Sequence, residues 1–358
     1  MRGHIVKRSK DSYTVVVSLG RDPVTRKPKQ HWQSVKGTKK DAERLLSETL
    51  NSLDKGGFVK PTAKTVAEFL NQWLKDYATD HVRPRTFQRY QGIIRCHLIP
   101  TLGSIPLTRL QPSHIQACHA KALQSRKDGK GGTLTAKSVL QHHRVLSEAL
   151  SHALKMGLVA RNVAQAVDPP KPVNREMRSL DSFGVQTFLE AAKGTIYYPV
   201  FHLDVYTGLR RSEILGLRWR DVNLLMATLS VVQVLHRLPG GKTVFLEPKT
   251  AKGRRSVSLS PNAVLSLKAH REQQEMLRAM RGSALSEDDM VFSQPDGSPL
   301  KPDTVSHAFI AIARKAGLGA VRLHDLRHTH ATLMLQQGVH PKIVQERLGH
   351  ANIAITLV

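Results

Sequence analysis

The chain has 358 residues, of which 40% are hydrophobic and 23% charged, a composition typical of a globular protein with two or three domains. Its 54 Lys and Arg residues against 28 Asp and Glu give a formal net charge of +26, which indicates a polyanionic partner. The sequence predicts neither a membrane span nor a secretory signal, and its two cysteines, Cys96 and Cys118, form no metal-binding or redox motif.

The positive charge is spread along the whole chain. Residues 1–60, 61–172 and 173–358 each carry more Lys and Arg than Asp and Glu. A solvated basic surface, or an RNA-binding protein of the ribosomal kind, would also be basic, so the charge alone leaves these alternatives open. A protein that is basic in every part is expected to contact its polyanion with all of its domains.

Residues 1–60 are predicted to form a small sheet packed on one helix. Residues 13–19 (YTVVVSL) are rich in β-branched side chains, and residues 29–35 (KQHWQSV) alternate polar and bulky side chains after a turn-rich segment. Residues 38–57 predict a helix, because Thr38 suits its N-cap, leucines recur at helical spacing, and Gly56-Gly57 ends it.

Residues 64–168 are predicted to form a second domain, which is all-helical. Its first helix carries Val66, Phe69, Leu70, Trp73, Leu74 and Tyr77 on one face. The second helix is expected to end at Pro100, because proline interrupts the helical hydrogen bonds. The four helices are expected within residues 65–78, 83–103, 111–126 and 133–159.

Residues 167–180 are rich in proline and charge, which predicts a linker to a third domain at residues 175–358. This domain is predicted to be mostly helical, with one small three-stranded sheet. The sequence thus predicts a multi-domain protein that is mainly α with small β-sheets. The three predicted strands lie at residues 227–236, 242–248 and 254–260.

The stretch YTGLRRSEILGLRWRDV (206–222) places Arg210 at the start of a predicted helix, directly after Gly208. The free N–H groups of a helix start favour an anion. Glu213 lies one turn further on, where it can hold the Arg210 guanidinium. A plain surface ion pair would look the same in sequence and is the commoner case.

The stretch EPKTAKGRRSVSL (247–259) places Lys249 in a tight turn between two predicted strands. A turn of this kind can push one ammonium group into a groove. Lys252, in the same turn, is a rival for that position. Lys249 could equally be one exposed lysine among several.

The stretch LHDLRHTHATLMLQQGV (323–339) predicts a helix on which His324, Arg327 and His328 share one face. Two histidines at this spacing could bind zinc, but a third ligand is missing and a cation lies between them, so a metal site is disfavoured. Asp325 and His328 are explained more simply, as a helix-start acid and a helix-packing residue.

The stretch ERLGHANIAITLV (346–358) contains a Gly349 turn followed by His350, which in isolation would be an ordinary capping residue. Together with the three earlier stretches, it contributes to a set of two Arg, one Lys and two His side chains. No carboxylate cluster or phosphate-binding glycine loop accompanies them. Such a set can surround a phosphodiester and stabilise a phosphoryl-transfer transition state without a metal.

In this order and spacing, the motifs TGLRRSEILGLRW, PKTAKGRRSVSL, HDLRHTHATLML and LGHANIAITL resemble those of the tyrosine recombinases of the phage-integrase type. The resemblance covers residues 175–358 as the catalytic domain. Residues 64–168 resemble the core-site DNA-binding domain of that family. Residues 1–60 resemble its small arm-site DNA-binding domain, a three-stranded sheet with a helix.

The resemblance implies a role for each matching residue. Arg210 corresponds to the first catalytic arginine and Glu213 to the acid that supports it. Lys249 corresponds to the β-turn lysine that protonates the leaving 5′ oxygen. The residues that match the last two motifs are His324 and Arg327 of the His-x-x-Arg pair, and His350, which contacts the scissile phosphate.

The nucleophile of this family is a tyrosine that forms a 3′-phosphotyrosine link, so that strand exchange needs neither ATP nor a metal. The family places it roughly nine or ten residues after the last histidine, which is about one or two positions beyond Val358. Tyr197, Tyr198 and Tyr206 all precede the motifs. The chain as given is therefore expected to hold no nucleophile and to be inactive in cleavage.

The resemblance implies a site-specific integrase of a phage or mobile element, which acts on double-stranded attachment sites as a homotetramer without cofactors. An accessory DNA-bending protein is a further expected partner, and the expected location is the bacterial cytoplasm, at the nucleoid. A remnant that binds DNA without cutting it is the alternative. A type IB topoisomerase shares the chemistry, but it needs no second DNA site.

Overall fold

The structure is a computed structural model that divides into two compact units, Met1–Asn174 and Arg175–Val358. It is mainly α-helical with small antiparallel sheets, which confirms the predicted fold class. The predicted division into three domains stays a prediction. The residues that the structure describes are 3–21, 26–54, 63–124, 133–173, 178–238, 240–248, 253–350 and 352–353.

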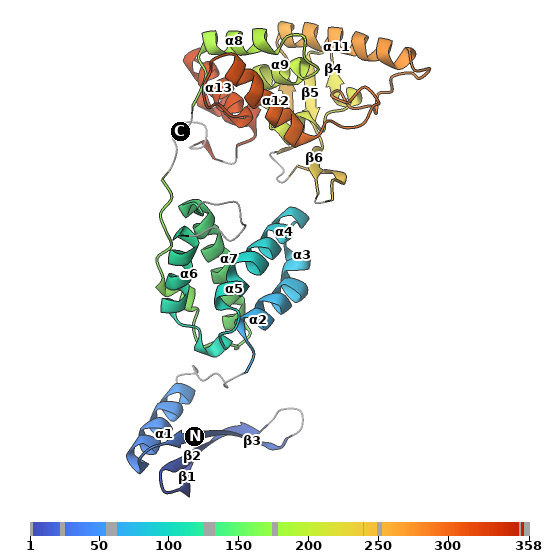
Figure 1. The fold of residues 1–358 in the computed structure, drawn as a ribbon. Coiled ribbons are helices and arrows are strands. Elements are labelled where there is room, and N and C mark those ends of the chain that lie inside the picture. Colours follow the sequence, from blue (N-terminus) through green and yellow to red (C-terminus); the bar gives the residue numbers. More distant parts are fainter. Residues whose placement is uncertain are drawn as a thin grey trace. The chain divides into compact units, whose positions relative to one another are not determined.

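The N-terminal part of the first unit is an antiparallel sheet of three strands with one helix on one face (Figure 1). Val15 and Val17 point to the helix and pack with Ala42, because successive side chains of a strand alternate between its faces. Val16 pairs in register with Trp32 on the other face. The elements are β1 (Gly3–Ser9), β2 (Ser12–Arg21), β3 (Pro28–Lys36) and α1 (Lys39–Asp54).

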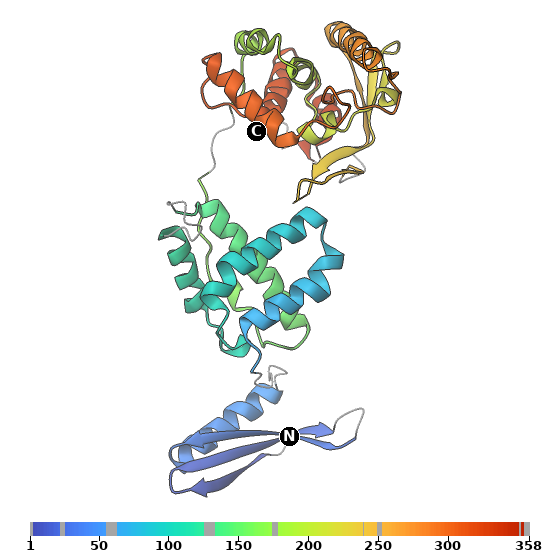
Figure 2. The same cartoon turned by 45° about the vertical axis from the view of Figure 1, so that its right-hand side comes forward.

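The rest of the first unit is helical, and its helices pack around one core (Figures 1 and 2). Two π-helical turns, Leu74–Ala78 and Ile94–Leu98, join α2 to α3 and α4 to α5, so four long helical stretches result, as predicted. The helices are α2 (Val66–Trp73), α3 (Thr79–His81), α4 (Pro84–Ile93), α5 (Ile99–Leu102), α6 (Pro112–Gln124) and α7 (Ala136–Lys155).

Local signals explain where these helices begin, and one of them was misread. Thr65 caps α2, since its hydroxyl accepts from the Glu68 N–H while the Glu68 carboxylate accepts from the Thr65 N–H. Pro100 was predicted to end the second stretch, but the helix continues to Leu102. The preceding π-helical turn shifts the hydrogen-bond pattern, so Pro100 falls in the first turn of α5, where its missing N–H is tolerated.

The second unit encloses its own core, in which the rings of Phe188, Phe201 and Phe309 contact one another at centroid distances of 4.6–5.6 Å. Helices from the beginning and the end of this unit contribute to that core. They are α8 (Ser182–Ala192), α9 (Tyr198–Thr207), α10 (Arg211–Ile214), α11 (Pro261–Ala279), α12 (Pro302–Lys315), α13 (Leu323–Gln336) and α14 (Pro341–Leu348).

The strands of this unit form two sheets, where the sequence predicted one. The order β4-β5-β8 makes a three-stranded sheet, while β6 pairs with β7 alone among the described strands, so the predicted single strand at residues 227–236 is wrong. The chain turns near Gln233, whose side-chain amide donates to the Gly216 carbonyl at 2.9 Å. The strands are β4 (Val222–Asn223), β5 (Thr228–Val231), β6 (Val234–Arg237), β7 (Thr243–Leu246) and β8 (Arg255–Ser258).

Gly216 permits this turn because the chain around Gln233 passes directly over it. A Cβ atom at Gly216 would lie 3.0 Å from the Gln233 carbonyl oxygen and 3.1 Å from the backbone of Val234. The predicted three-stranded sheet therefore exists, but β4 takes the place of residues 242–248. Within the described ranges, no helix is both long enough and apolar enough to cross a membrane.

Candidate active site

The turn after α9 brings the first predicted site residue into place. Gly208 ends α9 with a φ of +61°, a left-handed conformation that favours glycine. A Cβ atom here would lie 2.7 Å from Cδ2 of Leu348 and 2.8 Å from Cδ2 of His330. The packing at this position therefore also leaves no room for a side chain. Arg210 follows as the N-cap residue of α10, as the sequence predicted.

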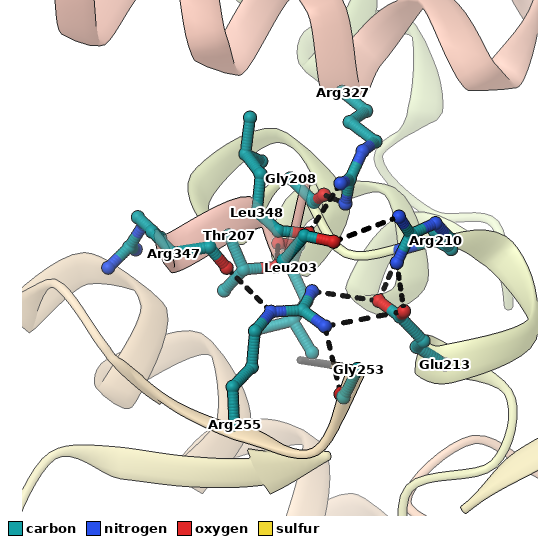
Figure 3. A network of polar contacts seen from close by, with 11 residues as sticks. Leu203, Thr207, Gly208, Arg210, Glu213, Gly253, Arg255, Arg327, Arg347 and Leu348 are labelled. Atoms are coloured by element: carbon teal, nitrogen blue, oxygen red, sulfur yellow. Dashed lines mark hydrogen bonds and ion pairs between the residues drawn. The ribbon is translucent and has the colours of Figure 1, made fainter. Parts of the chain in front are cut away.

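Glu213 is the acidic centre of the site and is 2% exposed. Its Oε1 accepts from Nη1 of Arg210 at 2.7 Å, and its Oε2 accepts from the Arg210 N–H at 2.9 Å. Arg255 donates to the same carboxylate from Nη2 at 2.9 Å and from Nη1 at 3.3 Å (Figure 3). Glu213 therefore holds two guanidinium groups, one of which the sequence predicted.

The charges around Glu213 decide its protonation. Burial alone would raise the pKa of the Glu213 carboxyl, but the hydrogen bonds and charge of Arg255, followed by the charge of Arg210, outweigh burial and lower this pKa. The carboxylate is therefore ionised at neutral pH. Because it is ionised and buried, it fixes both guanidinium groups in position.

Arg327 extends from α13 into the same cluster and is 2% exposed. Its Nη1 donates to the Gly208 carbonyl at 2.6 Å, and its Nη2 donates to the Leu348 carbonyl (Figure 3). Burial, and then the charge of Arg210, lower the pKa of Arg327 to about 9, so the group stays protonated at pH 7. The Arg327 guanidinium is thus held by two carbonyl groups, whereas His324 is exposed and His328 half-buried, so the three residues predicted to share one face differ in burial.

The end of α14 delivers three consecutive carbonyl groups to the three guanidinium groups. The Arg347 carbonyl accepts from Nε of Arg255 at 2.6 Å, the Leu348 carbonyl accepts from Arg327, and the Gly349 carbonyl accepts from Nη2 of Arg210 at 3.4 Å. The last carbonyl groups of a helix have no intrahelical partner and carry its negative end. They therefore bind the arginines without adding another ionised group.

His350 follows this helix end directly and is 7% exposed. Burial, and then the positive charges of Arg327 and Arg210, lower the pKa of His350 to about 4. The imidazole is consequently neutral at pH 7, and a neutral imidazole can donate one hydrogen bond and accept one. The predicted residues Arg210, Glu213, Arg327 and His350 are therefore brought together.

The remaining predicted residues stand differently. His324 is on the exposed side of α13, with its ring 5.2 Å from that of His328. Partial removal from water, and then the charges of His328 and Arg327, lower the pKa of His324 to about 4. Asp325 caps the start of α13 by accepting from the Arg322 N–H at 2.8 Å, as expected of a helix-start acid. The predictions for Lys249 and its rival Lys252 lie outside the described residues.

Arg255 is the main residue that the sequence analysis missed. Its side chain is only 7% exposed. A signal for it exists in β8, where Arg255 and the buried Val257 share one face, so the alternation places the arginine inward. An inward arginine needs an acidic partner, and Glu213, 42 positions earlier, supplies it.

A second buried carboxyl group, Asp204 of α9, is 2% exposed and interacts electrostatically with Arg327 and Glu213. Its Oδ1 has no hydrogen-bond partner among the described residues. Burial raises the pKa of Asp204 well above its usual value, although the charge of Arg327 opposes this. The Asp204 carboxyl therefore stays protonated at pH values where an ordinary aspartate is ionised. At mildly acidic pH it is neutral and does not cancel the charge of the arginines.

The cluster as a whole is positive, since three guanidinium groups face one ionised carboxylate. Fixed guanidinium groups suit the non-bridging oxygens of a phosphate, which they bind through paired N–H donors. In the part of the chain that the structure describes, no group of three His, Cys, Asp or Glu side chains could hold a metal ion. The arrangement can bind a phosphodiester and stabilise added negative charge on it.

Comparison with protein families places these residues in a known context. The family model for the phage integrase family matches residues 178–358, and the model for the phage integrase N-terminal SAM-like domain matches residues 65–123. A tyrosine recombinase XerC-like protein of Caldanaerobacter subterraneus subsp. tengcongensis is 28% identical over 98% of this chain and 92% of that protein. The ICEBs1 integrase of Bacillus subtilis is 24% identical over 99% of this chain and 94% of that protein.

Solved structures show the same fold. The Tn1549 transposon integrase in complex with a circular intermediate DNA has a TM-score of 0.68 at 20% identity, over 82% of this chain and 94% of that chain. A lambda integrase dimer bound to a COC′ core site has a TM-score of 0.61 at 20% identity, over 99% of this chain and 93% of that chain.

Proposed function

The chain belongs to the phage integrase family and is a site-specific DNA recombinase, and we propose that it cleaves and rejoins double-stranded DNA at the cluster of Arg210, Glu213, Arg255, Arg327 and His350. The observation that carries this proposal is the set of three guanidinium groups held by one buried carboxylate and by the ends of α9 and α14. These contacts fix positive charge before any DNA arrives, which is the requirement for stabilising a developing negative charge.

We assign the binding of the scissile phosphate to Arg210 and Arg327, because each keeps N–H donors beyond those that bind other described residues. The neutral imidazole of His350 donates a further hydrogen bond to a phosphate oxygen, and His324 at the rim assists it. Glu213 and Arg255 do not contact the phosphate and act as positioning residues. These roles rest on the geometry described above and on the match to the family motifs.

The chemical step follows from the family resemblance. A tyrosine phenolate attacks the scissile phosphorus, a 3′-phosphotyrosine bond forms, and the bond to the 5′ oxygen breaks. Lys249 gives its proton to that leaving oxygen. The new strand reverses the step with its own 5′ hydroxyl. The positive charge that a metal ion provides in other phosphoryl-transfer enzymes comes here from guanidinium groups.

The first unit supplies DNA-binding surfaces in this proposal. Residues 64–168 grip the core site next to the cleavage point. Residues 1–60 bind a separate arm site through the face of the sheet that α1 leaves uncovered, where Trp32 is 53% exposed and the Arg8 guanidinium lies 5.9 Å from its ring centroid. An aromatic ring with an arginine beside it suits contact with sugar, base edge and phosphate.

The assembly is also proposed. A lambda integrase tetramer is known on a Holliday junction, and that structure has a TM-score of 0.60 with this chain. We propose that this chain likewise acts as a tetramer on paired attachment sites, in the bacterial cytoplasm, with a DNA-bending protein as an accessory. Deletion of residues 1–60 should abolish binding to the arm site and leave core-site binding intact. Loss of both, or of neither, would contradict the separate arm-site module.

The phosphate assignment can be tested with DNA alone. The attachment site is first selected from a random duplex library, and one duplex is then prepared with a neutral methylphosphonate at the scissile position. We expect the polypeptide of residues 1–358 to prefer the natural phosphate by about tenfold or more, because a hydrogen bond to a charged group contributes roughly 1.5–3 kcal/mol.

Arg327→Ala should lose this preference and keep its affinity for the methylphosphonate duplex. Arg314→Ala, which removes an exposed arginine of α12, is the matched control and should keep the preference. An undiminished preference in Arg327→Ala would overturn the assignment of the phosphate site.

The chemical step needs the nucleophile. A nicked attachment site should trap a covalent adduct only with a polypeptide that carries the family tyrosine. A polypeptide extended through the family tyrosine should trap the 3′-phosphotyrosine adduct on the same DNA. Arg210→Ala in the extended polypeptide should abolish the adduct, and a normal adduct yield would refute its catalytic role.

A further inference from the structure

Arg347, next to the cluster, makes an unusual number of contacts for a residue that the sequence analysis did not single out. Its Nη1 donates to Oγ of Ser258 at 2.9 Å, and its Nη2 donates to the carbonyl groups of Ser258 and Tyr206, both at 3.0 Å. Its Nε lies 3.0 Å from Nε2 of His330. One side chain thus ties α14 to β8, to the end of α9 and to α13.

The contacts of His330 fix the form of its ring. Nδ1 lies 2.9 Å from the Val205 carbonyl, which can only accept, so Nδ1 carries the hydrogen. A guanidinium group can only donate, so Nε2 must be the acceptor for Arg347. His330 is therefore neutral, in the Nδ1–H form. It is 8% exposed, and burial followed by the charge of Arg347 lowers its pKa to about 4.

This pair adjoins the proposed phosphate site through the backbone of α14. The carbonyl of Arg347 itself accepts from Arg255, and the next two carbonyl groups accept from Arg327 and Arg210. His350 follows one residue later. Wherever the end of α14 lies, it therefore sets the position of three guanidinium groups and of one imidazole.

We propose that His330 and Arg347 are positioning residues for the recombination reaction, which hold the end of α14 against α9 and β8 and do so only while His330 is neutral. The inference deepens the proposed function, on which it rests. Neither residue faces the phosphate. They act through Arg255, Arg327, Arg210 and His350, and neither carries one of the roles implied by the family motifs.

A proton on His330 would oppose the contact in two ways. Nε2–H would face the Nε–H of Arg347, so two donors would meet where a donor and an acceptor met before. Two cations would also share a buried site that holds a further cation, Arg327, on the same helix. Among the described residues, the charged side chains that act on His330 are Arg347 and Arg327, and no acid is among them. The Arg347 side chain would move away from His330, and the end of α14 would lose the four hydrogen bonds that this side chain donates.

The first arm of the test measures the ring directly. Residues 1–358 with 15N-labelled imidazole groups are examined by NMR, and the His330 signals are identified as those that vanish in His330→Gln. We expect the Nδ1–H form and no titration of His330 above pH 5. In Arg347→Met, which keeps an unbranched stem without donors, the pKa of His330 should rise. An Nε2–H form, or titration of His330 above pH 5 in the unsubstituted protein, would overturn the inference.

The second arm measures what the positioning does. His330→Gln keeps an oxygen that can accept from Arg347, whereas His330→Phe keeps an aromatic ring without an acceptor. We expect His330→Phe and Arg347→Met to lose the preference for phosphate over methylphosphonate, roughly tenfold, while their affinity for the methylphosphonate duplex is unchanged. His330→Gln should retain most of the preference. Equal preferences in the Phe and Gln variants would overturn the inference.

Two comparisons keep the outcomes distinct. Arg347→Lys, which can still donate to His330, should restore part of the preference that Arg347→Met loses, and this covers the case in which Arg347→Met does not fold. If the preference is absent even in the unsubstituted protein, the proposed phosphate site is wrong. The NMR arm then decides alone whether Arg347 requires a neutral His330.

Discussion

Replacing Glu213 by Gln tests the electrostatic basis of the site. The substitution keeps the size of the side chain and one oxygen acceptor, but removes the only ionised carboxylate that contacts Arg210 and Arg255 in the described part of the chain. The two arginines differ in exposure, since the Arg255 side chain is 7% exposed and that of Arg210 is 39% exposed. The cost should therefore arise mainly from the buried charge of Arg255.

The magnitude follows from this difference. Removing one partner of a buried ion pair costs roughly 3–5 kcal/mol, while a half-exposed pair contributes at most about 1 kcal/mol. Because Gln retains an acceptor, we expect a loss of about 3 kcal/mol in the free energy of unfolding. For a unit of this size, such a loss lowers the melting temperature by roughly 6–12 °C.

Trp219 provides the assay. It is fully buried in the second unit, whereas Trp32 and Trp73 belong to the first, so a background with Phe at those two positions reports the second unit alone by fluorescence. The matched control is Glu190→Gln, which breaks an exposed pair with Lys193 and should leave the melting temperature close to that of the parent protein. A melting temperature for Glu213→Gln equal to that of the control would refute the reasoning.

Three further substitutions have defined outcomes. Gly208→Ala should destabilise the second unit in urea by roughly 1–3 kcal/mol, because its Cβ would meet Leu348 and His330 at a positive φ; an unchanged midpoint would contradict the tight approach. Thr65→Ala should cost about 1 kcal/mol in the first unit by removing the cap of α2, and no loss would contradict that cap. Folding raises the pKa of the Asp204 carboxyl, so the stability that its protonated form contributes is present below the unfolded pKa and is lost as the pH rises. The melting temperature of Asp204→Asn should therefore rise relative to that of the parent protein between pH 4 and pH 8. Parallel plots of melting temperature against pH for the two proteins would contradict a raised pKa.

Local sequence signals predicted those parts of the site that lie within one or two helical turns. Glu213 is three residues from Arg210, and Gly208 stops α9 two residues before it, so the first half of the cluster could be read from a single stretch. The helical stretches of the first unit could also be predicted from the sequence, because their apolar residues recur at regular helical spacing. In each case the residues that interact are close in the sequence.

The features that the sequence did not predict depend on contacts between distant residues. Arg255 meets Glu213 across 42 positions, and Arg347 meets Ser258 across 89. The division of residues 227–236 into two strands follows from the approach of Gln233 to Gly216, 17 positions earlier, which neither helical nor strand periodicity reveals. The passage of a helix through Pro100 depends on the π-helical turn before it, and the periodicity carries no sign of that turn.

The carbonyl groups at the end of α14 have a consequence for the thermodynamics of DNA binding. A guanidinium group has five N–H donors, and Arg327 uses two of its donors on the backbone of Gly208 and Leu348. Its long side chain is therefore ordered when the protein folds, and the entropy of that ordering, roughly 0.5–1.5 kcal/mol for each such side chain, is lost before DNA is met. DNA binding therefore does not have to order this side chain again. A larger part of the free energy of each new contact between Arg327 and phosphate is then available for stabilising the transition state.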